Sequence, residues 1–138
     1  MAGIGKTKAS LRVIGDDLIP DDITNELGGF PSFSHAKGEV IVGQSGAERV
    51  TKFGMWRLEA DVEIPGDLDR QIEAIFGELT ENLDSWAYIS DSYRVELFCG
   101  LFLSGGNEGI EISSENLRML GERNIEIQFD IYAPDSYS

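Results

Sequence analysis

The sequence predicts an α+β fold: a single two-layer sandwich with a mainly antiparallel sheet of about five strands and helices on one face. Three observations predict it. Apolar and polar residues alternate over 56–64 and 125–132, the run Arg94–Ser104 is apolar at most positions, and apolar residues recur every three or four positions over 68–86. Strict alternation gives a strand one core face and one wet face, as antiparallel sheets commonly have. The expected element order is β-α-β-β-α-β-α-β.

The first half of the chain supplies four of these elements. Residues 9–15 alternate as a short strand, and a helix begins at Pro20, which suits the first helical position, and ends at Gly28. The apolar run 40–42 is a second strand, followed by a turn that leads into the next one. Residues 56–64 form the clearest alternating strand of this half.

The second half supplies the rest. Asp67 is a suitable N-cap for one long helix over 68–86, whose apolar stripe covers the sheet. Arg94–Ser104 is expected to be the central strand. A short helix capped by Ser113 or Ser114 precedes the last strand, 125–132. Residues 1–8 are expected to be a flexible tail, residues 9–133 one domain, and residues 134–138 a second tail.

The expected central strand is apolar on both faces. Phe98 and Phe102 point away from the face that carries Leu97 and Leu101, so both faces need cover. If the strands 56–64 and 125–132 lie beside it, the outer face is an apolar centre with a polar rim. The candidate interaction surface therefore consists of Phe98, Phe102, Arg57, Glu59, Gln128 and Tyr132.

Composition narrows the classes of partner. The 25 acidic residues outnumber the 11 lysines and arginines, and the net charge of −14 repels nucleic acid and anionic membranes. No apolar run reaches the about 20 residues that a membrane-spanning helix needs. The first residues contain no apolar signal segment, and Cys99 is the single cysteine, so we expect a cytoplasmic protein.

No residue pattern predicts catalysis. His35, the single histidine, falls in a loop and is expected to be exposed; Gly43–Ala47 lacks the second glycine of a nucleophile elbow. Glu59, Asp61 and Glu63 would lie about 7 Å apart along a flat strand, without the cleft that paired catalytic carboxylates need. We therefore expect no catalytic residue, no metal site and no cofactor, and a protein that is not an enzyme.

Several segments together resemble a known family. They are ASLRVIGDDLIPDDITNELGG near the start, Lys37-Gly38-Glu39, Gly54 with Trp56, and the closing short helix followed by IEIQFDIYA. In this order they resemble the bacterial "domain of unknown function 4279" family, from about Ala9 to Ala133. The resemblance implies a small, stand-alone bacterial α+β domain. It brings no established activity, so Lys37, Gly38 and Trp56 are family-motif positions of unknown role.

Three functions remain open. The first is a non-enzymatic interaction module that uses the open face of its sheet, in its simplest form a homodimer. The second is an immunity-type or inhibitor protein whose acidic residues bind a basic toxin or nuclease. The third is a small hydrolase of unknown substrate built around His35. We expect a protein partner or self-association in the first two cases.

Overall fold

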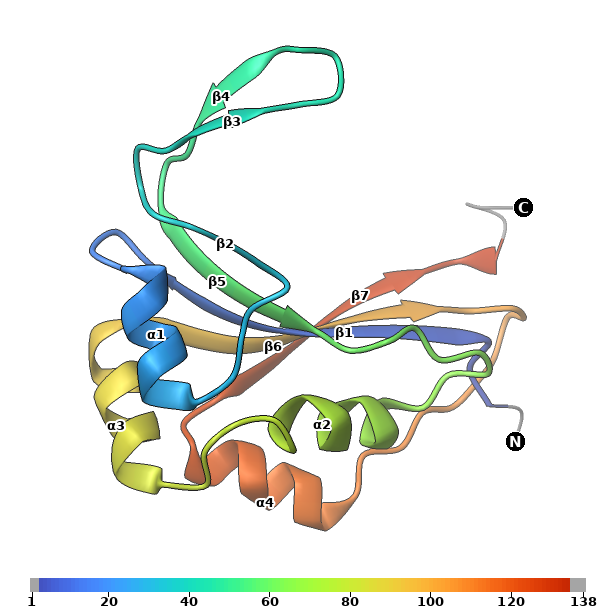
Figure 1. Cartoon of the computed structure of the whole chain (residues 1–138). Coiled ribbons are helices and arrows are strands. Elements are labelled where there is room, and N and C mark those ends of the chain that lie inside the picture. Colours follow the sequence, from blue (N-terminus) through green and yellow to red (C-terminus); the bar gives the residue numbers. More distant parts are fainter. Residues whose placement is uncertain (1–2, 135–138) are drawn as a thin grey trace.

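A computed structural model describes residues 3–134 of the chain. These residues form two layers, a five-stranded sheet and four helices that all lie on one side of it, as Figure 1 shows. A small two-stranded hairpin projects from the other side (Figure 1). The α+β class and the placement of the helices on one face are therefore confirmed. One side of the sheet is left without a covering layer.

The sheet has the strand order β2-β5-β1-β6-β7. All neighbours are antiparallel except β6 and β7, which are parallel. The expectation that Arg94–Ser104 forms the central strand was wrong: β6 lies one position from the centre, and β1 is central. The strands are β1 (Lys6–Gly15), β2 (Phe33–His35), β5 (Gly54–Glu59), β6 (Arg94–Phe102) and β7 (Glu126–Tyr132).

The expectation of a flexible tail over residues 1–8 needs correction, because residues 6–8 belong to the central strand β1. The strand already begins at Lys6, while Ile4 is 3% exposed and Thr7 is fully buried. Thr7 accepts a hydrogen bond from the backbone of Asp67, and Gln71 donates one to the carbonyl of Thr7. Ile4 and Thr7 are thus part of the core. The expected C-terminal tail, residues 134–138, lies outside the described residues except for Pro134.

The helical layer contains one helix more than expected within residues 3–134. The predicted helix over 68–86 is two helices, because Thr80 and Asn82 accept backbone hydrogen bonds with their side chains and so compete with helical pairing. Asn82 caps the second of them. The helices are α1 (Pro20–Leu27), α2 (Leu68–Phe76), α3 (Leu83–Ser92) and α4 (Ser114–Glu122).

The turn expected after residues 40–42 is confirmed as a hairpin. Its strands, β3 (Val40–Val42) and β4 (Glu48–Val50), pair with each other and with no other strand of the described chain. By contrast, the strand expected over 56–64 ends at Glu59. Beyond it the alternation fails in the structure, since Ile64 is 75% exposed.

The core lies between the sheet and the helices. Trp56, Trp86, Leu97 and Ile72 are completely buried there. Val95, Leu97, Cys99 and Leu101 of β6 face this core, as their spacing predicts. None of the helices within residues 3–134 is both long and apolar enough to cross a membrane.

Candidate functional site

The candidate site is the side of the sheet that carries no helices, called the open face from here on. Residues that lie opposite each other in paired strands share a face, so the strand registers define its membership. Five of the chain's 11 lysines and arginines project from it, against four carboxylates within the five strands. The cations are Lys6, Lys8, Arg12, Arg57 and Arg94; the carboxylates are Glu59, Glu96, Glu126 and Asp130.

The open face is therefore far less acidic than the chain as a whole, which carries 11 basic and 25 acidic side chains. Charge is segregated between the two sides of the molecule. Acidic residues occupy the first turn of each helix, for example Asp21 and Asp22 of α1 and Asp84 of α3. The electrostatic potential that a partner meets at the open face therefore differs from the potential at the helical side.

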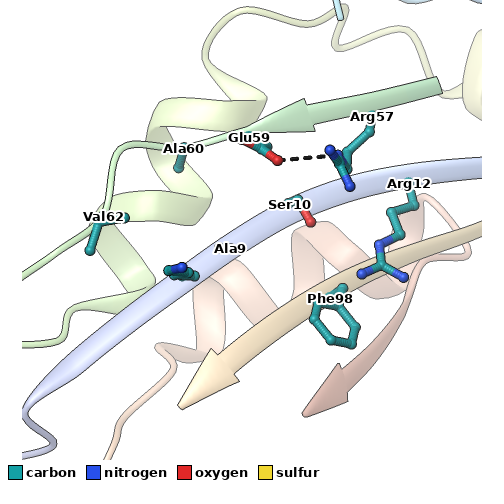
Figure 2. A pocket seen from close by; sticks show the side chains of 9 residues that line it. Ala9, Ser10, Arg12, Arg57, Glu59, Ala60, Val62 and Phe98 are labelled. Carbon is teal, nitrogen blue, oxygen red and sulfur yellow. Dashed lines mark ion pairs between the residues drawn. The ribbon is translucent and has the colours of Figure 1, made fainter. Parts of the chain in front are cut away.

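Two arginines and one phenylalanine form the centre of this face (Figure 2). Arg12 lies directly opposite Arg57 across the β1–β5 pair. The guanidinium carbon of Arg12 is 3.9 Å from the centroid of the Phe98 ring, and Nε of Arg57 is 3.1 Å from Oε1 of Glu59. Both arginine side chains are partly buried, 23% and 31% exposed. This places two like charges side by side on a partly buried area of the open face.

Neighbouring groups only partly offset this charge. Nη1 of Arg12 is 3.6 Å from Oε1 of Glu96, and the same carboxylate lies 3.2 Å from Nε of Arg94. Arg94 in turn donates to Glu126 at 2.8 Å, and this hydrogen bond raises the pKa of Arg94. Burial lowers the pKa of Arg12; Glu96 opposes that change and Arg57 adds to it. An additional carboxylate beside Arg12 and Arg57 would interact favourably with the positive charge of both.

A second cationic group lies further along β1. Nζ of Lys6 is 4.2 Å and Nζ of Lys8 is 5.5 Å from the centroid of the Phe102 ring. The other side of that ring system is occupied by Tyr132, whose ring is stacked on Phe102 at a centroid distance of 4.5 Å and an angle of 7°. Within residues 3–134, neither lysine forms an ion pair with a carboxylate.

The structure brings together the sequence-predicted surface only in part. Gln128 and Tyr132 of β7 lie directly opposite Phe98 and Phe102, as expected. Arg57 and Glu59 do not flank β6, because β1 lies between β5 and β6. The two phenylalanines are half-buried beneath cations, so the expected uncovered apolar centre is replaced by cation–aromatic contacts.

Sequence reasoning missed Lys6, Lys8 and Arg12, the three cations on β1. The assignment of residues 1–8 to a tail removed the first two from consideration. The sequence contained a signal: positions 6, 8, 10 and 12 hold polar residues, and positions 9, 11 and 13 hold apolar residues. Positions 7, 9, 11 and 13 are buried in the structure. Extending the period-two alternation of residues 9–15 toward the N-terminus would have found them.

A shallow groove of ≈ 280 Å³ runs across this centre. It is open to solvent and is wide enough for one or two side chains of an extended peptide. Figure 2 shows it from the open-face side, with the helices behind the sheet. Its polar lining consists of Lys8, Ser10, Arg12, Arg57 and Glu59, and its apolar lining of Ala9, Ala60, Val62 and Phe98.

His35 is placed differently from the expectation. It was expected in an exposed loop, but it lies on β2, is 7% exposed, and contacts the rings of Phe33 and Phe53. Its Nδ1 has no hydrogen-bond partner among the described residues. The hollow beside it is lined by Arg49, Val50, Thr51, Lys52 and Phe53, a set without a carboxylate or a serine or cysteine nucleophile.

The family-motif positions have structural roles in the described chain. Gly38 turns the chain at φ +87° where the hairpin begins, and Lys37 forms an exposed ion pair with Asp16 at 3.4 Å. Trp56 is fully buried, and its Nε1 donates to Thr24 Oγ1 at 3.0 Å, which joins β5 to α1. None of the three reaches the groove.

Within residues 3–134, no three His, Cys, Asp or Glu side chains come together in a way that could hold a metal ion. The fold and the site define a small α+β protein with helices on one side and an open cationic and aromatic sheet face on the other. The chain belongs to the family described as Domain of unknown function (DUF4279), whose model matches residues 5–134. No curated protein and no solved structure matches the chain.

Proposed function

We propose that this protein is a non-enzymatic interaction module that binds an acidic segment of a partner protein on the open face of its sheet. The observation that carries the proposal is the pair of guanidinium groups, Arg12 and Arg57, placed opposite each other beside Phe98. Like charges directly opposite in a sheet are destabilising. A pair of this kind favours a ligand that supplies negative charge.

The distribution of charge supports a peptide with spaced carboxylates as the ligand. Lys6, Lys8 and Arg12 lie at alternate positions of one strand, about 7 Å or a multiple of it apart. An extended peptide presents alternate side chains at the same spacing.

A nucleic acid fits this face less well than a peptide does. Its continuous row of phosphates would run past Glu59 and Glu96, and past Glu126 and Asp130 on β7. The net charge of −14 repels every anionic ligand at long range, and it repels a polyanion more strongly than a short peptide. Isolated carboxylates can be placed between these acidic residues, whereas a polyanion cannot avoid them.

The alternative of an immunity-type protein that binds a basic toxin or nuclease uses another surface. A basic partner is attracted to the helical side, where the first turns carry Asp21, Asp22 and Asp84. The two proposals therefore differ in the side of the molecule that is covered. The hydrolase alternative has no support from the surroundings of His35, where the lining residues include neither a carboxylate nor a serine or cysteine nucleophile.

Fluorescence anisotropy with a defined probe tests the proposal. The probe is a labelled octapeptide of alternating glutamate and tyrosine, and its control replaces each glutamate with glutamine. We expect binding of the acidic peptide alone, weakened at least about tenfold by Arg12→Gln combined with Arg57→Gln, because charge-assisted hydrogen bonds contribute about 1.5–3 kcal/mol each. Lowering the salt concentration should strengthen it.

The matched control is Arg70→Gln combined with Arg118→Gln, which makes the same change in net charge at exposed positions of α2 and α4. We expect this variant to bind as the wild type does. Equal losses in the two double variants would mean that only the overall charge matters, and binding of an oligolysine peptide in place of the acidic one would favour the basic-partner alternative. Either result would overturn the proposal.

A further inference from the structure

The outer edge of the sheet at β7 is unprotected. This seven-residue strand contains no lysine or proline, two residues that commonly block pairing at an edge, and its charged residues are Glu126 and Asp130. The opposite edge, β2, has only three residues. In Figure 1 the C-terminal half of β7 rises away from the helical layer. Phe129 is accordingly 45% and Ile131 61% exposed, although both point to the same side of the sheet as the buried Cys99 and Leu101.

The direction of the backbone groups shows what this edge can accept. The N–H of Leu103 donates to the carbonyl of Tyr132 at 3.0 Å, so that carbonyl points toward β6. Carbonyl and N–H groups of successive strand residues point to opposite edges. The groups of Ile127, Phe129 and Ile131 therefore point outward, where residues 3–134 place no further strand.

We propose that β7 pairs with β7 of a second copy of this chain, antiparallel and with the two-fold axis at Phe129, so that two five-stranded sheets become one. In this register Phe129 faces Phe129 of the second copy, and Ile127 faces Ile131. These are the residues whose backbone groups point outward, so they make the hydrogen-bonded pairs. The apolar side chains that the helices leave uncovered then cover one another.

The other side of the strand selects this register. Gln128 faces Asp130 of the second copy, a pairing in which the amide can donate to the carboxylate. Glu126 faces Tyr132, an uncharged side chain whose hydroxyl donates to Asp130 of its own chain. With the axis at Gln128 instead, Glu126 would face Asp130 in both halves. With the axis at Asp130, the two Asp130 carboxylates would face each other. Like charges directly opposite are unfavourable in a sheet.

The arrangement leaves the peptide-binding groove free. Antiparallel edge pairing keeps the open faces of both copies on the same side, and the groove between β5, β1 and β6 is separated from the new edge. The inference is independent of the proposed function. Because one strand pair is a small interface, we expect a dimer that dissociates on dilution, with a Kd on the order of micromolar or weaker.

Sedimentation over a range of protein concentrations, with two substitutions at the half-buried Gln128, tests the pairing. Gln128→Glu places a carboxylate opposite Asp130 of the second copy and should raise the dimer Kd. Gln128→Lys places a cation there and should lower it. Symmetry makes the change twice, and cross-strand charge pairs contribute about 0.2–1 kcal/mol each, so we expect shifts of about two- to thirtyfold in opposite directions. The controls Asn25→Glu and Asn25→Lys, on exposed α1, change the net charge equally and should leave the Kd near the wild-type value.

Phe129→Cys gives a second readout that does not depend on charge. At the two-fold axis the two Cα atoms would be about 5.5 Å apart, within the range of a disulfide. Mild oxidation should therefore join two copies, whereas the wild type, with only the buried Cys99, should stay unlinked. A wild-type protein that is monomeric at all concentrations would overturn the inference. A dimer Kd that changes no more in the Gln128 variants than in the Asn25 controls would also overturn it. Arg57→Gln should leave dimerisation unchanged, so loss of peptide binding and loss of the dimer are distinguishable.

Discussion

Arg12 and Arg57 lie directly opposite each other in the pairing of β1 with β5, and Arg12 also covers the ring of Phe98. Two like charges in this position do not stabilise a sheet. Glu59 pairs with Arg57, whereas Glu96 pairs with Arg94 as well as with Arg12. The proposed binding of an acidic peptide rests on this pair.

Arg57→Gln is expected to separate stability from binding. The substitution removes an exposed ion pair with Glu59, worth about 0–1 kcal/mol, and also relieves a repulsion of similar size with Arg12. The free energy of unfolding in urea should thus change by less than about 1 kcal/mol, while binding of the acidic peptide falls. A large loss of stability instead would assign Arg57 a structural role.

The hydrogen bond between Trp56 and Thr24 should stabilise the junction of β5 and α1. Thr24→Val leaves the buried Nε1 without an acceptor, and we expect a loss of about 1–3 kcal/mol in the free energy of unfolding. In a Trp56→Phe background there is no indole N–H that could lose its acceptor. The same substitution should therefore lower the free energy of unfolding much less. Equal losses in both backgrounds would show that the bond contributes nothing.

Gly38→Ala should loosen the hairpin without unfolding the sheet. Gly38 has φ +87°, and an added Cβ would touch nothing within 4 Å, so only backbone strain of about 1–2 kcal/mol is introduced. The N–H of residue 38 donates to the carbonyl of Thr51, and the N–H of Thr51 donates to the carbonyl of Glu39. Hydrogen exchange at both amides should accelerate about tenfold. Gly121→Ala, on exposed α4 with equal space and no positive φ, is the control and should not accelerate exchange. Unchanged exchange in both variants would contradict this account.

Cys99 should be inert in the folded protein. Burial raises the pKa of its thiol to about 12, so the reactive thiolate is nearly absent at pH 8. Labelling by a thiol reagent should be fast only after unfolding. Because the unfolded thiol ionises near pH 9, the stabilisation from keeping it protonated is present below pH 9 and is lost as the pH rises from 9 toward 12. Rapid native labelling at pH 8 would refute the assignment.

The sequence predicted the class of fold because periodicity reports burial locally. Alternation identified the faces of β6 and β7, and the spacing over 68–86 identified the apolar surface of two helices. It could not show the break between α2 and α3, which depends on side-chain hydrogen bonds of Thr80 and Asn82 that compete with the helix. Apolar spacing continues across such a break.

The site was predicted less completely, and the reason is topological. Phe98, Phe102, Gln128 and Tyr132 were recognised because they lie on adjacent strands that are apolar or alternate visibly. The order β5-β1-β6 places β1 between the two halves of the expected surface, and no local pattern states which strand is central. The cations of β1 therefore entered the site only once the strand pairing was known.

The most direct test of peptide binding on the open face is an NMR titration of the ¹⁵N-labelled protein with the glutamate–tyrosine octapeptide. The account predicts chemical-shift changes that centre on the amides of β1, β5 and β6 around Arg12, Arg57 and Phe98, and that are absent with the glutamine peptide. Changes that centre on the helices, or none at peptide concentrations that saturate the anisotropy signal, would contradict it.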